Sequence, residues 1–145
     1  MLHGPNLNLL GTREPSVYGK TTLAEIDQML LRRGEQLGVQ VRCAQSNSEG
    51  ELVDLIQGAA AWADALIINP AGYSHTSVAI RDAIAAVGIR AVEVHLSNPQ
   101  AREPFRHLDL VAGACWALVA GFGAVGYLVA LERVAAAHGL AFEES

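Results

Sequence analysis

The chain has 145 residues, of which 51% are hydrophobic and 17% are charged, and its formal net charge at pH 7 is -5. This length and apolar content predict a single domain over residues 1–145 and exclude a disordered chain. The charges form no basic run and no apolar stretch reaches the roughly 18 residues of a membrane span, so we expect neither nucleic acid nor a membrane as a partner.

The cysteines indicate the compartment. Cys43 and Cys115, the two cysteines of the chain, lie far apart in apolar, strand-like surroundings. Such positions are typical of buried thiols in a reducing environment rather than of a disulfide or a metal site. The chain also enters a strand and a loop almost at once, without the pattern of a signal peptide. We therefore expect a cytoplasmic protein.

The first loop of the chain is unusual. A short apolar strand at Met1–Leu2 is followed by a long stretch without helical or strand periodicity. Loops this long are usually functional lids or linkers, and the apolar and aromatic content favours a lid at about residues 9–20. Arg13 lies five residues before Tyr18 and can bring a guanidinium beside the phenol, which favours the phenolate, a base. In the alternative interpretation, the segment is an ordered surface loop whose tyrosine only packs.

Helix and strand patterns alternate after this loop. Thr22 and Glu25 form a capping box that begins a helix. Residues 39–43 alternate as in a strand until residues 45–47 break the run, and a second capping box at residues 48–51 begins another helix. The apolar positions expected to face the core in these two helices are Leu23, Ile26, Leu30 and Leu37, then Leu52, Val53, Ile56 and Ala60.

The remaining segments complete the alternation. Residues 65–68 are continuously apolar, as in a strand that is buried on both faces of a parallel sheet. Residues 91–96 and about 114–120 are predicted as further strands, and helices are predicted to start near Val78 and near Val125. In the last helix we expect one face to hold Val125, Leu128, Leu131 and Val134. The pattern predicts an α/β fold, a doubly wound five-stranded parallel sheet of flavodoxin-like order with helices on both faces.

A glycine-rich motif lies between the last strand and the last helix. Gly121-Phe122-Gly123-Ala124-Val125-Gly126 matches GxGxxG, which is half of a dinucleotide fingerprint. No following strand completes a βαβ unit, and no acidic residue ends a strand about 20 positions later. We therefore interpret these glycines as close packing of helix on sheet and set dinucleotide binding aside.

Polar residues gather where the predicted strands end. They are Asn6 after the first strand, Asn69 and His75 after the third, and His95, Ser97 and later Arg106 after the fourth. Ligands of such sheets bind outside the carboxyl ends of the strands, so a shared site is predicted. Each residue alone also fits a turn, a cap or a satisfied histidine. Glu93 lies on the same strand face as His95, where it can orient the imidazole and help it donate a proton near neutral pH.

These motifs together resemble one family. The segments that carry the resemblance are Gly4-Pro5-Asn6-Leu7-Asn8, Arg13-Glu14-Pro15 through Tyr18-Gly19, Gln45-Ser46-Asn47, residues 69–77 with Arg81-Asp82, residues 93–98, and Gly126-Tyr127. In this combination they look like the type II 3-dehydroquinate dehydratases of the shikimate pathway, and the match covers almost the whole chain. Two positions depart from the family: the first strand is cut to Met1–Leu2, and Ala86 stands where some relatives carry an acidic residue.

The resemblance implies reversible dehydration of 3-dehydroquinate to 3-dehydroshikimate through an enolate, without metal, cofactor or Schiff base. It implies that Tyr18 is the base, that Arg13 favours its ionised form, that His95 is the acid, and that Asn6 helps to stabilise the enolate through a water. The residues that it assigns to the substrate are Asn69, Leu96 and Ser97 at the carboxylate, His75 and Arg106 at the ring hydroxyls, and Asp82 from a neighbouring subunit. The implied assembly is a trimer that associates further into a dodecamer.

The chemistry of such a reaction agrees with the residues. Loss of a proton next to a ketone needs a base, a donor for the developing oxyanion and an acid at the β-hydroxyl. The only lysine, Lys20, lies on the loop, which is a poor place for an amine that forms an imine. The alternative from another class is a non-catalytic flavodoxin-like binding module, which would need no tyrosine base.

Overall fold

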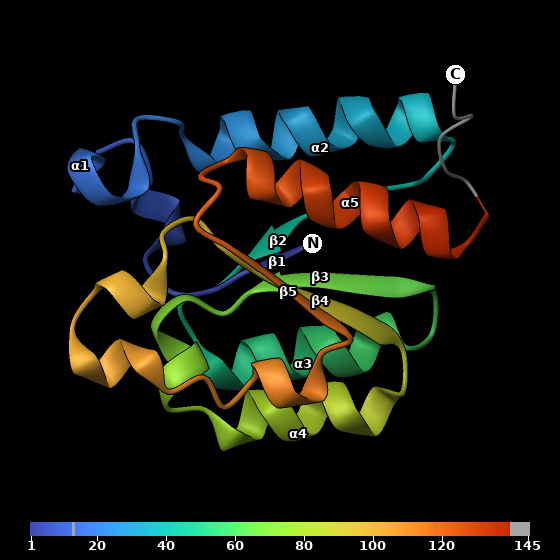
Figure 1. Cartoon of the computed structure of the whole chain (residues 1–145). Helices are drawn as coiled ribbons and strands as arrows, with labels where there is room; N and C mark the ends of the chain where they lie inside the picture. The colour runs from blue at the N-terminus through green and yellow to red at the C-terminus, as the bar shows by residue number, and fades with distance from the viewer. Residues whose placement is uncertain (13, 140–145) are drawn as a thin grey trace.

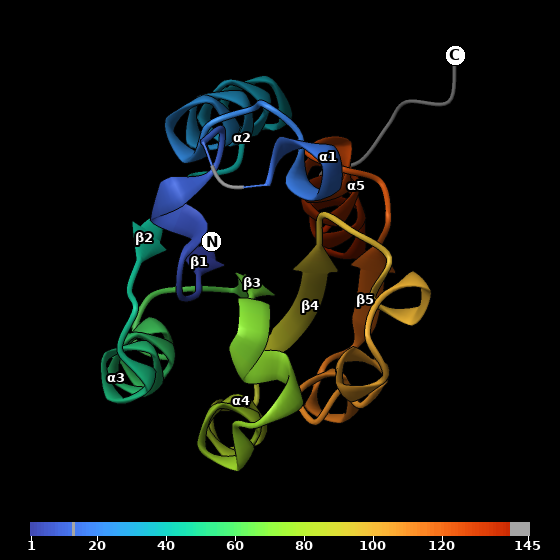
Figure 2. The same cartoon turned by 90° about the vertical axis from the view of Figure 1, so that its left-hand side faces the viewer.

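The structure is a computed structural model that describes residues 1–12 and 14–139. These residues form a five-stranded parallel sheet (Figure 1), and the strand order is β2-β1-β3-β4-β5 (Figure 2). The strands are β1 (Leu2–His3), β2 (Ala44–Gln45), β3 (Ala65–Asn69), β4 (Arg90–His95) and β5 (Ala117–Ala120). The helices are α1 (Pro15–Tyr18), α2 (Leu23–Leu37), α3 (Glu49–Ala59), α4 (Val78–Val87) and α5 (Val125–Ala137). The predicted flavodoxin-like order is confirmed.

Helices cover both faces of the sheet. Figures 1 and 2 show α2 and α5 on one face and α3 and α4 on the other. The central strand β3 sends Ile67 into the core under α2 and α5, and Leu66 and Ile68 into the core over α3 and α4. Its apolar run is continuous because both faces of the strand are buried. Within the described residues, none of the helices combines the length and apolarity that a bilayer crossing requires.

The start and end of α2 follow from its sequence. The Thr22 hydroxyl accepts a hydrogen bond from the N–H of Glu25 at 3.2 Å, which satisfies one of the free donors of the first turn. Gly38 ends the helix with a φ of 73°, in the left-handed region that glycine adopts without strain. Ile26 and Leu30 on the predicted apolar stripe are fully buried. This helix is thereby anchored to the sheet as predicted.

The second capping box forms in part. The Ser48 hydroxyl accepts from the N–H of Glu51 at 3.3 Å, as predicted. The Glu51 carboxylate, however, accepts from the Ser46 hydroxyl at 2.7 Å. At the other end of α3, Ala60 is exposed rather than buried, because the helix ends at Ala59 and that residue takes the inward position.

The second strand was predicted at residues 39–43, and this is wrong. The strand is Ala44–Gln45, where the N–H of Ala44 donates to the carbonyl of Met1 at 3.0 Å and the N–H of Ser46 donates to the carbonyl of His3 at 3.0 Å. Its partner β1 has 2 residues, so the segment before Ala44 lies beyond the reach of that ladder. Cavities of about 220 and 440 Å³ lie beside Met1 at this edge.

The buried face of α5 also differs from the prediction. Leu131 and Val134 are buried as expected, but Val125 is 57% exposed. The face is set instead by Tyr127, which is fully buried and whose hydroxyl accepts a hydrogen bond from Asn69 Nδ2 at 2.7 Å. A buried phenol needs such a partner, and its ring turns this side of the helix inward.

The glycine motif before α5 has two uses. Gly121 and Gly123 have φ values of 85° and 59°, so they shape the turn that links β5 to α5. A Cβ on Gly126 would lie 3.4 Å from Val119 Cγ1 and 3.6 Å from Val94 Cγ1. The interpretation as close helix-sheet packing is therefore confirmed for Gly126.

The thiols are free and half-buried rather than fully buried. Burial, with nearby carboxylates, raises the pKa of Cys43 and of Cys115 to about 12. Both therefore stay protonated and weakly nucleophilic at neutral pH.

The segment at about 9–20 was expected to lack regular structure, but its described residues include the short helix α1. Pro15 opens the single turn of α1, preceded by Glu14 at a φ of 40° and followed by Gly19 at a φ of 81°. A further 3-10 turn lies just before it at Leu7–Leu9. A single turn is too short to produce an apolar period, so the sequence could not reveal it.

Candidate active site

A cavity of about 200 Å³ lies at the carboxyl edge of the sheet, and residues at the ends of β3 and β4 and on α1 line it. The predicted site residues that line it are Asn6, Tyr18, Asn69, His75, His95, Leu96, Ser97 and Arg106. Arg13 lies outside the described residues, and Asp82 is absent from this lining. The topological rule for doubly wound sheets thus brings together residues that are far apart in the sequence.

Tyr18 enters the cavity from α1. The guanidinium carbon of Arg102 lies 5.1 Å from the centroid of the Tyr18 ring, and Arg102 also lines the cavity. Arg102 Nη1 donates to the Ser97 hydroxyl at 3.3 Å, which ties this cation to the end of β4. The structure therefore places a permanent positive charge beside the phenol from a residue that the sequence did not single out for the site.

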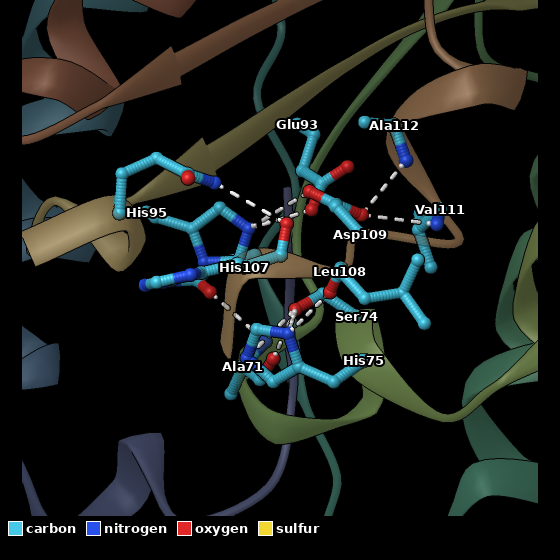
Figure 3. A network of polar contacts seen from close by, with 12 residues as sticks. Ala71, Ser74, His75, Glu93, His95, His107, Leu108, Asp109, Val111 and Ala112 are labelled. Atoms are coloured by element: carbon cyan, nitrogen blue, oxygen red, sulfur yellow. Dashed lines mark hydrogen bonds and ion pairs between the residues drawn. The ribbon is translucent and has the colours of Figure 1, made fainter. Parts of the chain in front are cut away.

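His95 is held by carboxylates at the end of β4. Its Nε2 lies 2.6 Å from Glu93 Oε1, the hydrogen bond expected from their shared strand face. Asp109, which the sequence did not single out, places Oδ2 3.7 Å from the same nitrogen. Figure 3 shows the three side chains together. Glu93 is fully buried and His95 is 8% exposed, so their interactions are little screened by water.

The electrostatics favour a protonated histidine. Burial acts to lower the pKa of His95, but Asp109 and Glu93 outweigh it and raise that pKa to about 9. Burial raises the pKa of Glu93 to about 7, and Asp109 adds to the rise. For Asp109, burial acts upward, but hydrogen bonding with His95 and Glu93 outweighs it and lowers the pKa to about 2. At neutral pH the group thus combines an imidazolium with an ionised Asp109.

The ligand atoms of Glu93, His95 and Asp109 lie within 4.8 Å of one another, as in a metal site. The hydrogen bond of 2.6 Å from Nε2 to Glu93, however, places a proton on the nitrogen that a metal would need. We therefore interpret these three residues as a proton-holding group.

Asn69 is fixed from both ends of its amide. Its Oδ1 accepts from the N–H of Ala71 at 3.0 Å, and its Nδ2 donates to the hydroxyl of Tyr127. One hydrogen of Nδ2 then remains for a ligand in the cavity. Asn6 sits nearby in a left-handed conformation with a φ of 68°, and its N–H donates to Asn47 Oδ1 at 3.0 Å. Asparagine tolerates this conformation better than most residues, so the turn is consistent with its sequence.

His75 and Arg106 supply further polar groups. His75 Nδ1 donates to the carbonyl of Leu108 at 2.7 Å, and its Nε2 lies 3.4 Å from the Ser74 hydroxyl. Arg106 Nε donates to Glu103 Oε2 at 2.6 Å, and its side chain is 20% exposed. Both line the cavity and can hydrogen-bond hydroxyl groups.

Asp82 lies elsewhere. It is on α4, its side chain is 66% exposed, and its nearest cation is its neighbour Arg81 at 3.4 Å. It therefore makes no part of this cavity.

The residues that sequence reasoning missed are Arg102, Asp109 and Tyr127. Arg102 lies in a short segment around Pro104 that also holds Glu103 and Arg106, and its charge was the one available signal. Asp109 follows that segment in irregular chain, where no periodicity relates it to β4. Tyr127 belonged to a motif of the resemblance but was given no role.

The chain is similar to proteins of one kind. The family model described as Dehydroquinase class II matches residues 1–135. A protein of Pelotomaculum thermopropionicum named 3-dehydroquinate dehydratase is 54% identical over 139 residues, which are 96% of each chain. The crystal structures of type II dehydroquinase from Propionibacterium acnes and from Butyrivibrio crossotus each have a TM-score of 0.90. The first is 41% identical in sequence to this chain, and the alignment covers 93% of each chain. The second is 40% identical, and the alignment covers 92% of this chain and 93% of the other.

Proposed function

The chain belongs to the class II dehydroquinase family and is a type II 3-dehydroquinate dehydratase, a hydro-lyase, and we propose that it removes water through an enolate with Tyr18 as the base and His95 as the acid. One observation carries this proposal. A tyrosine beside a guanidinium and a histidine beside two carboxylates line the same cavity from two different elements. The two protons that a dehydration moves need such a pair.

In the first step, the Tyr18 phenolate takes the proton from the carbon next to the substrate ketone. The C–H electron pair becomes the C=C bond of an enolate, and negative charge moves to the ketone oxygen. Arg13 keeps the role that the resemblance implies, which is to favour the phenolate, and Arg102 adds a second positive charge beside the Tyr18 ring. Asn6, at the cavity wall, stabilises the enolate oxygen through a water.

In the second step, the His95 imidazolium protonates the β-hydroxyl. The C–O bond breaks, its electrons leave with water, and the enolate electrons form the conjugated enone. Because the carboxylates hold Nε2, Nδ1 is the nitrogen from which the proton passes to the substrate. After this step both residues are neutral, and a net transfer of one proton from tyrosine to histidine restores them.

The remaining lining residues bind the substrate. Asn69, Leu96 and Ser97, at the ends of β3 and β4, hold the carboxylate. His75 and Arg106 bind ring hydroxyls. Lys20 does not line the cavity, which supports a reaction without an imine. Residues 1–145 form a single catalytic domain. Its segment at about 9–20 carries Tyr18 and acts as a lid over the active site.

The base is tested by Tyr18→Phe, assayed through the ultraviolet absorbance of the enone product. We expect kcat to fall at least about 100-fold because the general base is lost, with substrate affinity little changed. Tyr73→Phe is the matched control, since the Tyr73 hydroxyl donates to the Asn47 carbonyl at 2.8 Å and does not line the cavity. A Tyr18→Phe enzyme with near-normal turnover would remove Tyr18 from this role.

The assembly is the second part of the proposal, and we infer trimers that associate into dodecamers. Asp82 is exposed and does not line the cavity of its own chain, and Val78, one helical turn earlier on α4, is 56% exposed. An apolar side chain and a carboxylate on one exposed helix face suit a contact with a neighbouring subunit. Asp82 then completes the active site of that neighbour.

Mixed assemblies test this contact. Tyr18→Phe chains are refolded together with Asp82→Ala chains, after each single variant has been shown to be strongly impaired. Sites that combine the intact Tyr18 of one chain with the intact Asp82 of another should raise activity above the mean of the two parents. Activity equal to that mean in verified mixed trimers would show that Asp82 does not act across subunits.

A further inference from the structure

Asp109 is anchored beside the acid by its own backbone surroundings. Its Oδ1 accepts hydrogen bonds from the N–H groups of Val111 and Ala112, at 3.0 and 2.9 Å. The other oxygen, Oδ2, faces His95 Nε2 at 3.7 Å. Figure 3 shows the carboxylate between these backbone donors and the pair of Glu93 and His95. The position of Asp109 is therefore fixed independently of the histidine.

The two carboxyl groups near His95 are not equivalent. Glu93 is fully buried, and its second oxygen, Oε2, has no hydrogen-bond partner among the described residues. Asp109 has a side chain that is 22% exposed and receives two backbone donors. Donors and water both stabilise a carboxylate, whereas burial without donors favours the neutral acid. Asp109 is thus the better holder of the negative charge.

We propose that Asp109 is a positioning residue that keeps His95 protonated, by placing a permanent negative charge beside Nε2 while Glu93 fixes the orientation of the ring. The consequence for catalysis rests on the proposed function, in which His95 is the acid. Once Nδ1 has given its proton to the departing hydroxyl, the charge of Asp109 draws the next proton onto the imidazole. The pKa values agree with this division, since that of Asp109 is lowered and that of Glu93 is raised.

Other ionisable groups also surround this cluster and contribute to its field. They are Tyr18, His75, Arg102 and Arg106 in the cavity wall, His107 on the adjoining turn, and Cys115 near the two carboxyl groups. Asp109 and Glu93 are the only acidic side chains among the described residues that pair with His95.

The test is Asp109→Asn, which removes the charge and keeps an oxygen for the two backbone donors. The pKa of His95 is measured from the pH titration of its ring NMR signals, assigned by comparison with His95→Asn. We expect that pKa to fall by about one unit, since an opposite charge near a group commonly shifts it by 1–3 units and Glu93 ionises to compensate in part. Should the asparagine variant fail to fold, Asp109→Ser removes the same charge and keeps a capping hydroxyl.

Asp64→Asn makes the same charge change on an exposed residue before β3, at the opposite edge of the sheet, and should leave the pKa of His95 unchanged. An unchanged pKa in Asp109→Asn as well would overturn the proposal. The basic limb of kcat/KM against pH is recorded in parallel. If the pKa of His95 falls in Asp109→Asn while the basic limb of kcat/KM does not move, Asp109 keeps His95 protonated but His95 is not the acid. The two proposals are therefore tested separately.

Discussion

Two buried histidines lie at the carboxyl ends of strands, each against a carboxylate, yet only one faces the active-site cavity. His3, at the end of β1, places Nε2 2.7 Å from Asp27 Oδ1 of α2. His95, at the end of β4, places Nε2 2.6 Å from Glu93 Oε1. The pair distances are nearly equal, so the histidine-carboxylate contact by itself does not identify an acid.

The surroundings of the two pairs differ in the third group. Next to His3 and Asp27 lies Cys43, whose thiol stays neutral because burial and Asp27 raise its pKa to about 12. Next to His95 lies Asp109, which stays ionised. His3 is completely buried and its Nδ1 has no hydrogen-bond partner among the described residues, whereas His95 lines the cavity. His95 therefore has the access to the cavity and the second charge that the proposed acid needs, whereas the surroundings of His3 favour a structural role.

The largest expected difference between the two histidines is in the rate. His95→Asn should lower kcat by about 10² to 10⁴, the usual contribution of a general acid, in the enone assay. His3→Leu should keep kcat within a few-fold of the wild type because His3 does not reach the cavity. If His3→Leu lost as much activity as His95→Asn, the distinction between an acid and a structural histidine would fail.

The sequence was sufficient for the pair of Glu93 and His95 but not for its third member. Side chains that lie two positions apart on a strand project from the same face, so the contact between Glu93 and His95 follows from local geometry alone. Asp109 reaches the pair from irregular chain between two 3-10 turns, where only the tertiary fold brings it back to β4. Arg102 approaches Tyr18 in the same non-local manner. Local rules thus predict which residues gather at the edge of the sheet and miss the charges that arrive from loops.

The fold shows the same limit. The alternation of strands and helices predicted the sheet order, because few topologies satisfy the handedness and connection rules. The position of β2 was missed because a strand needs backbone hydrogen-bond partners on the neighbouring strand. The two residues of β1 pair with Ala44 and Gln45 and not with residues 39–43. The face of α5 was missed because it depends on the contact between Tyr127 and Asn69.

Tyr127 contacts both His3 and the active-site residue Asn69, and its substitution is expected to have the next largest effect. Its ring centroid lies 5.7 Å from that of His3, while its hydroxyl accepts from Asn69 at the cavity. Tyr127→Phe leaves a buried amide hydrogen without an acceptor, which should lower the free energy of unfolding by about 1–3 kcal/mol. The loosened Asn69 should raise KM a few-fold while kcat changes little.

Denaturant unfolding and steady-state kinetics measure both effects of Tyr127→Phe. The control is again Tyr73→Phe, whose hydroxyl is partly exposed and should cost less than about 1 kcal/mol. A Tyr127→Phe enzyme with normal stability and normal KM would mean that the structural region does not support the active site.

The smallest effect is expected for the stability of His3→Leu. Burial acts to raise the pKa of Asp27, but the hydrogen bond and charge interaction with His3 outweigh it, so this pKa lies below its ordinary value of 3.8. The Asp27 side chain is 29% exposed and water can replace part of the lost contact, so we expect a loss of about 1 kcal/mol at neutral pH. Leucine fills most of the space of the imidazole, which keeps the cavity contribution small.

The pH dependence identifies the source of this loss. A carboxyl group with a lowered pKa in the folded state stabilises the fold above its ordinary value of 3.8 and loses that contribution as the pH falls through the lowered value. The difference in unfolding free energy between wild type and His3→Leu should therefore be constant at neutral pH and shrink below about pH 4. His138→Leu, a matched change at an exposed histidine, should cost almost nothing at either pH. A difference for His3→Leu that stays constant into acid would mean that His3 stabilises the fold through packing rather than through the Asp27 carboxylate.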